Sequence, residues 1–165
     1  AVARLNQGGW RVVLATNQSG IGRGLFDMAS LNAIHAKMHR KLAAAGARVD
    51  AVFFCPHAPD EACPCRKPLP GLFTQIGERF GVSLASVPAA GNALRHVRAA
   101  AAAGCPAHLL LTGQSEHLRG RVGQGFRGRS GHGRLLERVP TSGNRLSDET
   151  RASHAGLSEV CDAGR

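Results

Sequence analysis

Short apolar segments alternate with helical segments through the first 113 residues, and this alternation limits the possible folds more than any other feature. The run WRVVLAT (10–16) predicts a buried strand, and apolar residues in 27–45 recur at spacings of three and four, as in an amphipathic helix. Further strands are predicted at 50–55, 86–92 and 108–113, and helices at 71–81 and 93–104. This alternation predicts an α/β fold with a doubly wound parallel sheet, whose ligands bind at the carboxyl ends of its strands.

Three loops follow the carboxyl ends of predicted strands, after Thr16, Cys55 and Gly91, and therefore meet at one edge of the sheet. The first, NQSGIGRG, offers hydroxyl, amide and backbone N–H donors to phosphoryl oxygens. Its glycines match neither a dinucleotide fingerprint nor a P-loop, so a plain flexible turn is an equal alternative.

The second loop, CPHAPDEACPCRKP (55–68), is called here the cysteine loop. It has the spacing C-x-H-x5-C-x-C and presents one imidazole and three thiolates, the ligand set of a closed structural zinc site. The ligands are Cys55, His57, Cys63 and Cys65. Unligated thiols beside an exposed histidine are the alternative. A redox pair is disfavoured, because one residue separates Cys63 from Cys65, where the usual motif has two.

Arg66 and Lys67 follow the last cysteine directly, so a metal-bound loop would aim both side chains. The arginine fork suits a bidentate phosphate contact, and the lysine is a compact charge for an oxygen that becomes more negative during phosphoryl transfer. Two solvated surface cations before a proline are the alternative.

Residues 114–165 differ from the rest in being rich in Gly, Arg and Ser and poor in apolar periodicity. They predict a basic tail that is disordered or results from a shifted reading frame. The net charge of +10 raises the question of nucleic-acid binding by this tail. The scattered cations and scarce aromatic residues argue against that function. With no apolar span and no secretory signal, the sequence predicts a cytoplasmic protein without membrane association.

Three segments in order, VVLATNQSGIGRG, FFCPHAP…CPCRKPLPG and VPAAGNALRHVRAAAAAGC, carry a family resemblance. The chain closely resembles the D-glycero-D-manno-heptose 1,7-bisphosphate 7-phosphatases of the haloacid dehalogenase superfamily, and next the histidinol-phosphate phosphatases. The resemblance covers about residues 1–113 and implies a partial phosphatase domain. It also implies a monomeric, Mg²⁺-dependent phosphomonoester hydrolase of carbohydrate metabolism that acts on a small phosphorylated sugar through an aspartyl-phosphate intermediate.

The resemblance also implies roles for individual residues. Thr16 would hold the phosphoryl group and Lys67 would neutralise its charge, which makes these two the candidate catalytic residues. The implied substrate-binding residues are Thr16, Asn17, Gln18, Ser19, Arg66 and Lys67. Cys55, His57, Cys63 and Cys65 would bind structural zinc, and Asn92 falls at a magnesium position.

The chain departs from the family at its carboxylates. The family's nucleophile and general acid lie in a D-x-D-G-T segment on its first strand, and no D-x-D occurs in these 165 residues. Asn92 and His96 replace two carboxylates in GNALRH. The expected fold is therefore a Rossmann-like haloacid dehalogenase sheet without its first strand. The expected activity is weak or absent in this chain alone, and a zinc-stabilised, non-catalytic phosphate-binding protein is the main alternative.

Overall fold

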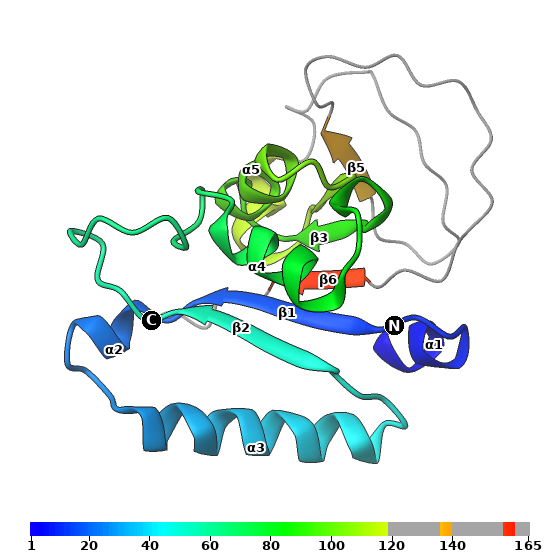
Figure 1. Cartoon of the computed structure of the whole chain (residues 1–165). Helices are drawn as coiled ribbons and strands as arrows, with labels where there is room; N and C mark the ends of the chain where they lie inside the picture. Colours follow the sequence, from blue (N-terminus) through cyan, green and yellow to red (C-terminus); the bar gives the residue numbers. More distant parts are fainter. Residues whose placement is uncertain (119–135, 140–156, 161–165) are drawn as a thin grey trace.

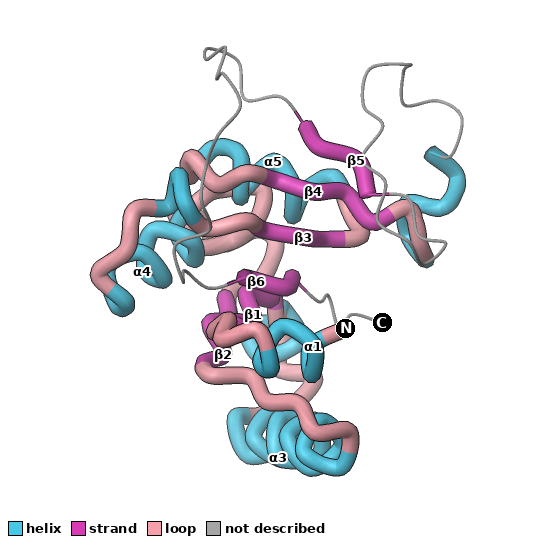
Figure 2. The backbone as a smooth tube through the Cα atoms, turned by 90° about the vertical axis from the view of Figure 1, so that its right-hand side faces the viewer, coloured by secondary structure: helices cyan, strands magenta, loops and turns pink. Residues whose placement is uncertain are grey.

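The computed structural model describes residues 1–118, 136–139 and 157–160. Its sheet has six strands in the order β2-β1-β6-β3-β4-β5 (Figure 2). The strands are β1 (Val12–Asn17), β2 (Ala51–Cys55), β3 (Ala89–Gly91), β4 (Ala107–Leu110), β5 (Leu136–Val139) and β6 (Leu157–Val160). All neighbouring pairs are parallel except β4 with β5, which is antiparallel. The predicted parallel α/β sheet is confirmed.

Helices cover both faces of this sheet. They are α1 (Val2–Gln7), α2 (Ser19–Gly22), α3 (Met28–Ala44), α4 (Gly71–Phe80) and α5 (Leu94–Ala102), with short 3₁₀ helices η1 (Leu84–Ser86) and η2 (Gly113–Leu118). In Figure 1, α3 lies on one side of β1 and β2, and α4 and α5 lie on the other. No helix in the described part of the chain is long and apolar enough to cross a bilayer.

Strand β1 supplies side chains to both layers, because successive strand residues point to opposite faces. Val12 and Leu14 join a cluster with residues of α1 and α3. Val13 and Ala15 join the larger core, which includes Phe73 of α4. Every residue of β1 is buried, as expected of a central parallel strand that reads as a continuous apolar run.

Local signals in the sequence set the ends of two helices. The carboxylate of Asp27 accepts a hydrogen bond of 2.8 Å from the backbone N–H of Ser30 and caps α3, and this bond lowers the pKa of Asp27. Helix α4 ends at Gly81, whose φ of 62° is in the left-handed region. Both ends agree closely with the predicted helices.

The sheet differs from the expected one at its centre. Strand β6, from the segment predicted to be a tail, lies between β1 and β3, with Leu157 opposite Val12 and Ser158 opposite Ala89. Strand pairing uses backbone groups, so a segment too short to show apolar periodicity can still fill a gap between two strands. Strand β5 pairs with β4 in the same way. The remainder of the predicted tail after residue 118 lies outside the described residues, and its disorder stays a prediction.

Phe73 tests the larger core, because its side chain is fully buried between α4 and the sheet. We expect Phe73→Ala to lower the free energy of unfolding by about 3–5 kcal/mol through lost burial and the cavity left behind. Gln75→Ala, at an exposed position of the same helix, is the control and should change stability by less than about 0.5 kcal/mol. Urea denaturation measures both; equal losses would show that α4 does not pack as described.

Candidate functional site

The cysteine loop and the loop after β1 begin side by side, because Asn17 and Cys55 are partners in the parallel pairing of β1 and β2. The backbone N–H of Gln18 donates to the carbonyl of Cys55 at 2.8 Å, and that of Gly22 donates to the carbonyl of Pro56, also at 2.8 Å. The predicted convergence of these two loops is therefore present. The segment after Gln18 is the short helix α2, where the sequence left a flexible turn as an alternative.

Gly22 is a residue of this site that the sequence analysis did not single out. A Cβ atom placed on it would lie 2.5 Å from the backbone nitrogen of Ala58 and 2.8 Å from the carbonyl oxygen of Pro56. Only glycine allows α2 to approach the backbone of the cysteine loop so closely. The signal was present as a glycine in a glycine-rich loop, but the contact it serves joins segments far apart in the sequence.

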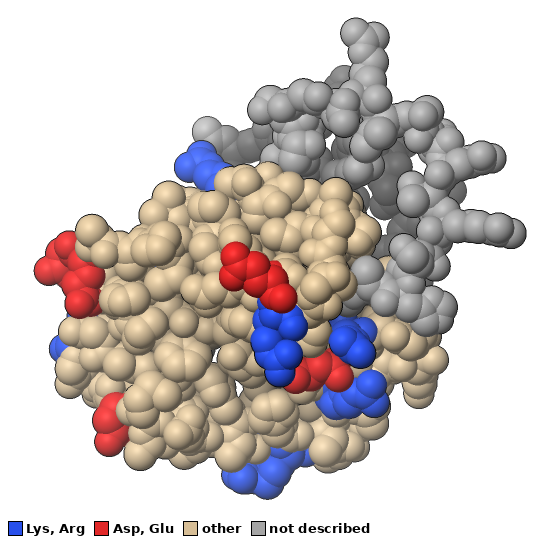
Figure 3. Space-filling model, viewed as in Figure 1, with Lys and Arg blue, Asp and Glu red and all other residues tan. Residues whose placement is uncertain are grey.

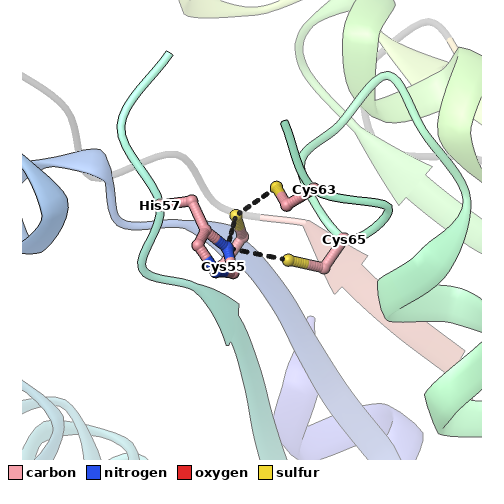
Figure 4. Close-up of side chains that lie close together, drawn as sticks. All are labelled: Cys55, His57, Cys63 and Cys65. Atoms are coloured by element: carbon pink, nitrogen blue, oxygen red, sulfur yellow. Dashed lines mark hydrogen bonds between the residues drawn. The ribbon is translucent and has the colours of Figure 1, made fainter. Parts of the chain in front are cut away.

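The four predicted ligands of the cysteine loop lie together (Figure 4). The ligand atoms of Cys55, His57, Cys63 and Cys65 all lie within 4.8 Å of one another. The sulfur atoms of Cys55 and Cys63 are 3.7 Å apart. The Nδ1 atom of His57 is 3.5 Å from the sulfur of Cys55 and 3.3 Å from that of Cys65.

These separations have the size of the edges of a tetrahedral metal site. With Zn–S bonds of about 2.3 Å and Zn–N bonds of about 2.0–2.1 Å, the edges are about 3.5–3.8 Å. Burial raises the pKa of the Cys65 thiol to about 12, with further contributions from Cys55 and Cys63. A dication at the centre would offset this cost of holding thiolates together. The residues therefore fit a metal ion, as the sequence predicts.

Lys67 is buried near the carboxyl end of β1, with 2% of its surface exposed. Its Nζ atom donates to the carbonyl oxygen of Ala15 in β1 at 2.8 Å. Its backbone N–H donates to Oδ1 of Asn17, and Nδ2 of Asn17 donates to the Lys67 carbonyl, both at 3.2 Å. The alternative of two solvated surface cations is therefore wrong for Lys67.

The other predicted phosphate-binding residues lie at the end of β1, at the start of α2 and next to Lys67 in the cysteine loop. Thr16 and Gln18 are both buried, and Nε2 of Gln18 donates to Oγ1 of Thr16 at 3.2 Å. Ser19 begins helix α2 and is partly exposed. Arg66 is half-buried, and its Nη1 atom donates to the carbonyl of His57 at 3.3 Å. The arginine is thus attached directly to a residue of the metal-ligand cluster.

The predicted magnesium position follows β3 at the same edge of the sheet. Asn92 comes directly after β3, and its carbonyl oxygen accepts a bond of 2.6 Å from Oγ of Ser115. His96 of α5 is fully buried beside Gly91, where a Cβ atom would lie 3.2 Å from the histidine Nδ1. Burial, and then Lys67 and Arg95, lower the pKa of His96 to about 3. The imidazole is therefore neutral near pH 7.

These residues do not fit a magnesium ion. Mg²⁺ prefers oxygen ligands and carboxylates, whereas this position offers the amide of Asn92 and a neutral imidazole beside cations. Within the described parts of the chain, the cysteine loop holds the only group of three or more His, Cys, Asp or Glu side chains close enough to share a metal ion. The doubt about magnesium at Asn92, which the sequence raises when Asn92 and His96 replace two carboxylates, agrees with the residues around it.

Arg95 is a second residue that the sequence analysis missed. It lies in the first turn of α5, between the predicted position Asn92 and the buried His96, and its side chain is half-buried. Desolvation and, secondly, the charge of Arg66 lower the pKa of Arg95. No sequence pattern marks Arg95, because the effect of Arg66 on its pKa depends on how the fold brings the two segments together.

Comparison with known proteins identifies close relatives, although no protein-family model matches the chain. It is 62% identical over 113 residues to the D-glycero-beta-D-manno-heptose-1,7-bisphosphate 7-phosphatase of Bordetella bronchiseptica, covering 68% of this chain and 63% of the relative. It is 45% identical over 121 residues to the enzyme of the same name from Pseudomonas aeruginosa, covering 73% and 68%. The chain thus spans about two thirds of the length of these curated relatives.

A solved structure agrees with the sequence comparison. The D,D-heptose 1,7-bisphosphate phosphatase of B. bronchiseptica, crystallised with magnesium and phosphate, has a TM-score of 0.70 and 57% sequence identity, covering 74% of this chain and 68% of that one. A HAD-like phosphatase of Mesorhizobium loti has a TM-score of 0.59 and 31% identity, which supports the same fold. The chain belongs to the D-glycero-beta-D-manno-heptose-1,7-bisphosphate 7-phosphatase family, within the HAD-like phosphatase fold.

Proposed function

We propose that this chain carries the phosphate-binding side of a sugar-phosphate phosphatase site, with the 7-phosphate of D-glycero-D-manno-heptose 1,7-bisphosphate as its ligand. The observation that carries the proposal is the burial of Lys67 against β1, where its side chain reaches Ala15 and its backbone is bonded to Asn17, the residues on either side of Thr16. This places a lysine at the carboxyl end of the strand, where ligands of α/β proteins bind.

Each residue of this edge has a chemical task in the proposal. Thr16 donates its hydroxyl to a phosphoryl oxygen, and Lys67 stabilises the negative charge there. Asn17 is a positioning residue, because both ends of its amide bond the Lys67 backbone. Gln18 orients the Thr16 hydroxyl, while Ser19 and Arg66 complete the substrate-facing side.

We further propose that the metal of the cysteine loop is zinc, held by Cys55, His57, Cys63 and Cys65. A three-thiolate, one-imidazole set is the preferred environment of structural Zn²⁺, with all four positions taken by the protein. The ion would supply stability to the loop and no coordination position for substrate. Its link to the phosphate site is the bond from Arg66 to the carbonyl of His57.

Binding without efficient turnover is the second candidate function, and the absence of a D-x-D segment from the 165 residues favours it. Covalent phosphoryl transfer needs a positioned nucleophile and an acid for the leaving oxygen. The residues described at this edge supply binding and charge, and none of them is an aspartate nucleophile. Nucleic-acid binding has less support, since acidic and basic side chains are interspersed on the face in Figure 3.

Phosphate release from heptose 1,7-bisphosphate, with and without added magnesium chloride, tests this proposal. We expect the purified chain to release phosphate at the rate of the uncatalysed control, and calorimetry with the same compound to show binding. Histidinol phosphate serves as the comparison substrate for the related phosphatases. Robust magnesium-dependent turnover would contradict the expectation, and would require a nucleophile other than a D-x-D aspartate.

A further inference from the structure

Two sulfur atoms of the cysteine loop lie close enough for a chemistry other than metal binding. The Sγ atoms of Cys55 and Cys63 are 3.7 Å apart, and in Figure 4 the Cys63 side chain points toward Cys55. We infer, on the basis of the proposed zinc site, that Cys55 and Cys63 are a redox pair. A hydroperoxide joins them in a disulfide, and the loop then releases its metal.

A disulfide between these two residues needs only a small movement. The S–S bond is about 2.05 Å long, so the sulfur atoms must come about 1.7 Å closer to each other. Cys55 ends β2 and is held by its pairing with Asn17. Residues 59–62, which connect the two cysteines, are exposed and have no core contacts to lose. The movement therefore falls on Cys63.

The three cysteines of the loop differ in exposure, and this difference assigns their roles. Cys55 and Cys65 are buried, whereas Cys63 is partly exposed. An oxidant must reach the sulfur that it oxidises, so oxidation of thiolates follows their exposure. Cys63 is therefore the residue that a hydroperoxide attacks, and Cys55, the sulfur beside it, resolves the product.

Cys65 is less suited to pair with Cys63. Its sulfur lies 3.3 Å from Nδ1 of His57, and one residue separates it from Cys63 in the chain, where the usual redox motif has two. Cys55 is eight positions away from Cys63, so this pair has no local sequence signal. The redox pair that the sequence disfavours is thus a different one from the pair that the fold brings together.

One molecule of hydrogen peroxide balances the reaction. The Cys63 thiolate attacks a peroxide oxygen, the O–O bond breaks, and a sulfenic acid and a hydroxide ion form. The Cys55 thiolate then attacks the Cys63 sulfur, the S–S bond forms, and a second hydroxide leaves. The two cysteines lose two electrons, the peroxide gains them, and both hydroxides take protons from solvent to become water.

The disulfide removes two of the four metal ligands. His57 and Cys65 remain, and two protein ligands do not make the closed four-coordinate site that structural zinc requires. Arg66 is bonded to the carbonyl of His57 at 3.3 Å, so loss of the metal also reaches a residue of the proposed phosphate site. Oxidation would therefore act on the loop as a reversible modification, because a thiol reductant restores both ligands.

Hydrogen peroxide treatment of the purified full chain, with its zinc content first measured by atomic emission, tests the pairing. A chromogenic zinc indicator follows metal release, and peptide mass spectrometry after alkylation of the remaining thiols maps the disulfide. We expect a Cys55–Cys63 disulfide and the loss of about one zinc ion per disulfide formed. Cys105, which is fully buried in the apolar core, should stay reduced in the same sample.

Cys63→Ser tests which sulfur the oxidant attacks, with Cys105→Ser as the matched control outside the ligand cluster. We expect Cys55 to stay reduced in Cys63→Ser, and Cys105→Ser to form the parent's disulfide. A Cys55–Cys65 disulfide that forms in Cys63→Ser as fast as the parent's disulfide would show that Cys63 is not needed. Circular dichroism verifies that both variants are folded.

Each outcome for the parent chain decides one point. A disulfide between Cys63 and Cys65, or oxidation of Cys63 to a sulfinic acid without a disulfide, would overturn the inference and leave the zinc site intact. Zinc retained after the Cys55–Cys63 disulfide has formed would overturn the metal release. If the purified chain binds no zinc, the proposed zinc site fails, and the disulfide map of the same sample still decides the pairing.

Discussion

Lys67→Met is expected to weaken phosphate binding by about a hundredfold, the largest effect of any single change at the phosphate-facing edge. Methionine keeps most of the side-chain length and fills the same buried space, but it removes the ammonium group that donates to Ala15. Loss of one charge-assisted hydrogen bond costs about 1.5–3 kcal/mol, which corresponds to about ten- to 150-fold in affinity. Calorimetry with inorganic phosphate measures the change directly.

The control for this substitution is Lys41→Met, at an exposed position of α3. It removes the same charge from the protein at a distance from the sheet edge, so it shows how much a general loss of positive charge matters. We expect its phosphate affinity to stay within about twofold of the parent. If Lys67→Met also stays within that range, while circular dichroism shows both proteins folded, Lys67 is not part of a phosphate site.

Cys65→Ser is expected to lower zinc affinity by more than about a hundredfold, because residues that only support ligands already contribute ten- to a hundredfold. Serine replaces a thiolate by a hydroxyl, which zinc binds poorly, and three ligands remain. Since Arg66 and Lys67 follow Cys65 directly, phosphate binding should weaken with it. Metal content measured by atomic emission, together with the phosphate titration, follows both effects.

Cys105→Ala provides the matched control for metal content. Cys105 is fully buried, and burial raises its pKa to about 12, as it does for Cys65. Both belong to the same apolar core, but Cys105 lies outside the ligand cluster. We expect this variant to lose some stability and to retain the parent's zinc stoichiometry. An equal loss of zinc in both variants would mean that the metal is bound elsewhere or responds only to general destabilisation.

The sequence predicts those parts of the fold that depend on local patterns. The run 10–16 reads as a buried strand because it is apolar and β-branched, and the ligands of the cysteine loop are recognisable because they are close in sequence. Asp27 and Gly81 mark helix ends by chemistry that acts over a few residues. These features could be derived before the structure was known.

Long-range contacts account for what the sequence did not predict. The burial of Lys67 involves a bond to Asn17, fifty positions away, and the effect of Arg66 on the pKa of Arg95 depends on the fold bringing the cysteine loop towards α5. The strand at Leu157–Val160 has no periodic pattern of its own that the sequence could reveal. Its position in the sheet comes from backbone pairing with β1 and β3. Such contacts are properties of the whole fold.

Two hydrogen bonds between the Asn17 side chain and the Lys67 backbone tie the end of the cysteine loop back to the sheet. The loop leaves at Cys55, the pairing partner of Asn17, and returns to the same asparagine at Lys67. Both ends of the loop are therefore held by one residue of β1, while residues 59–62, between the metal ligands, are exposed. An exposed segment of this kind can be exchanged or lengthened without moving the lysine, which makes it a practical place for grafting new sugar recognition.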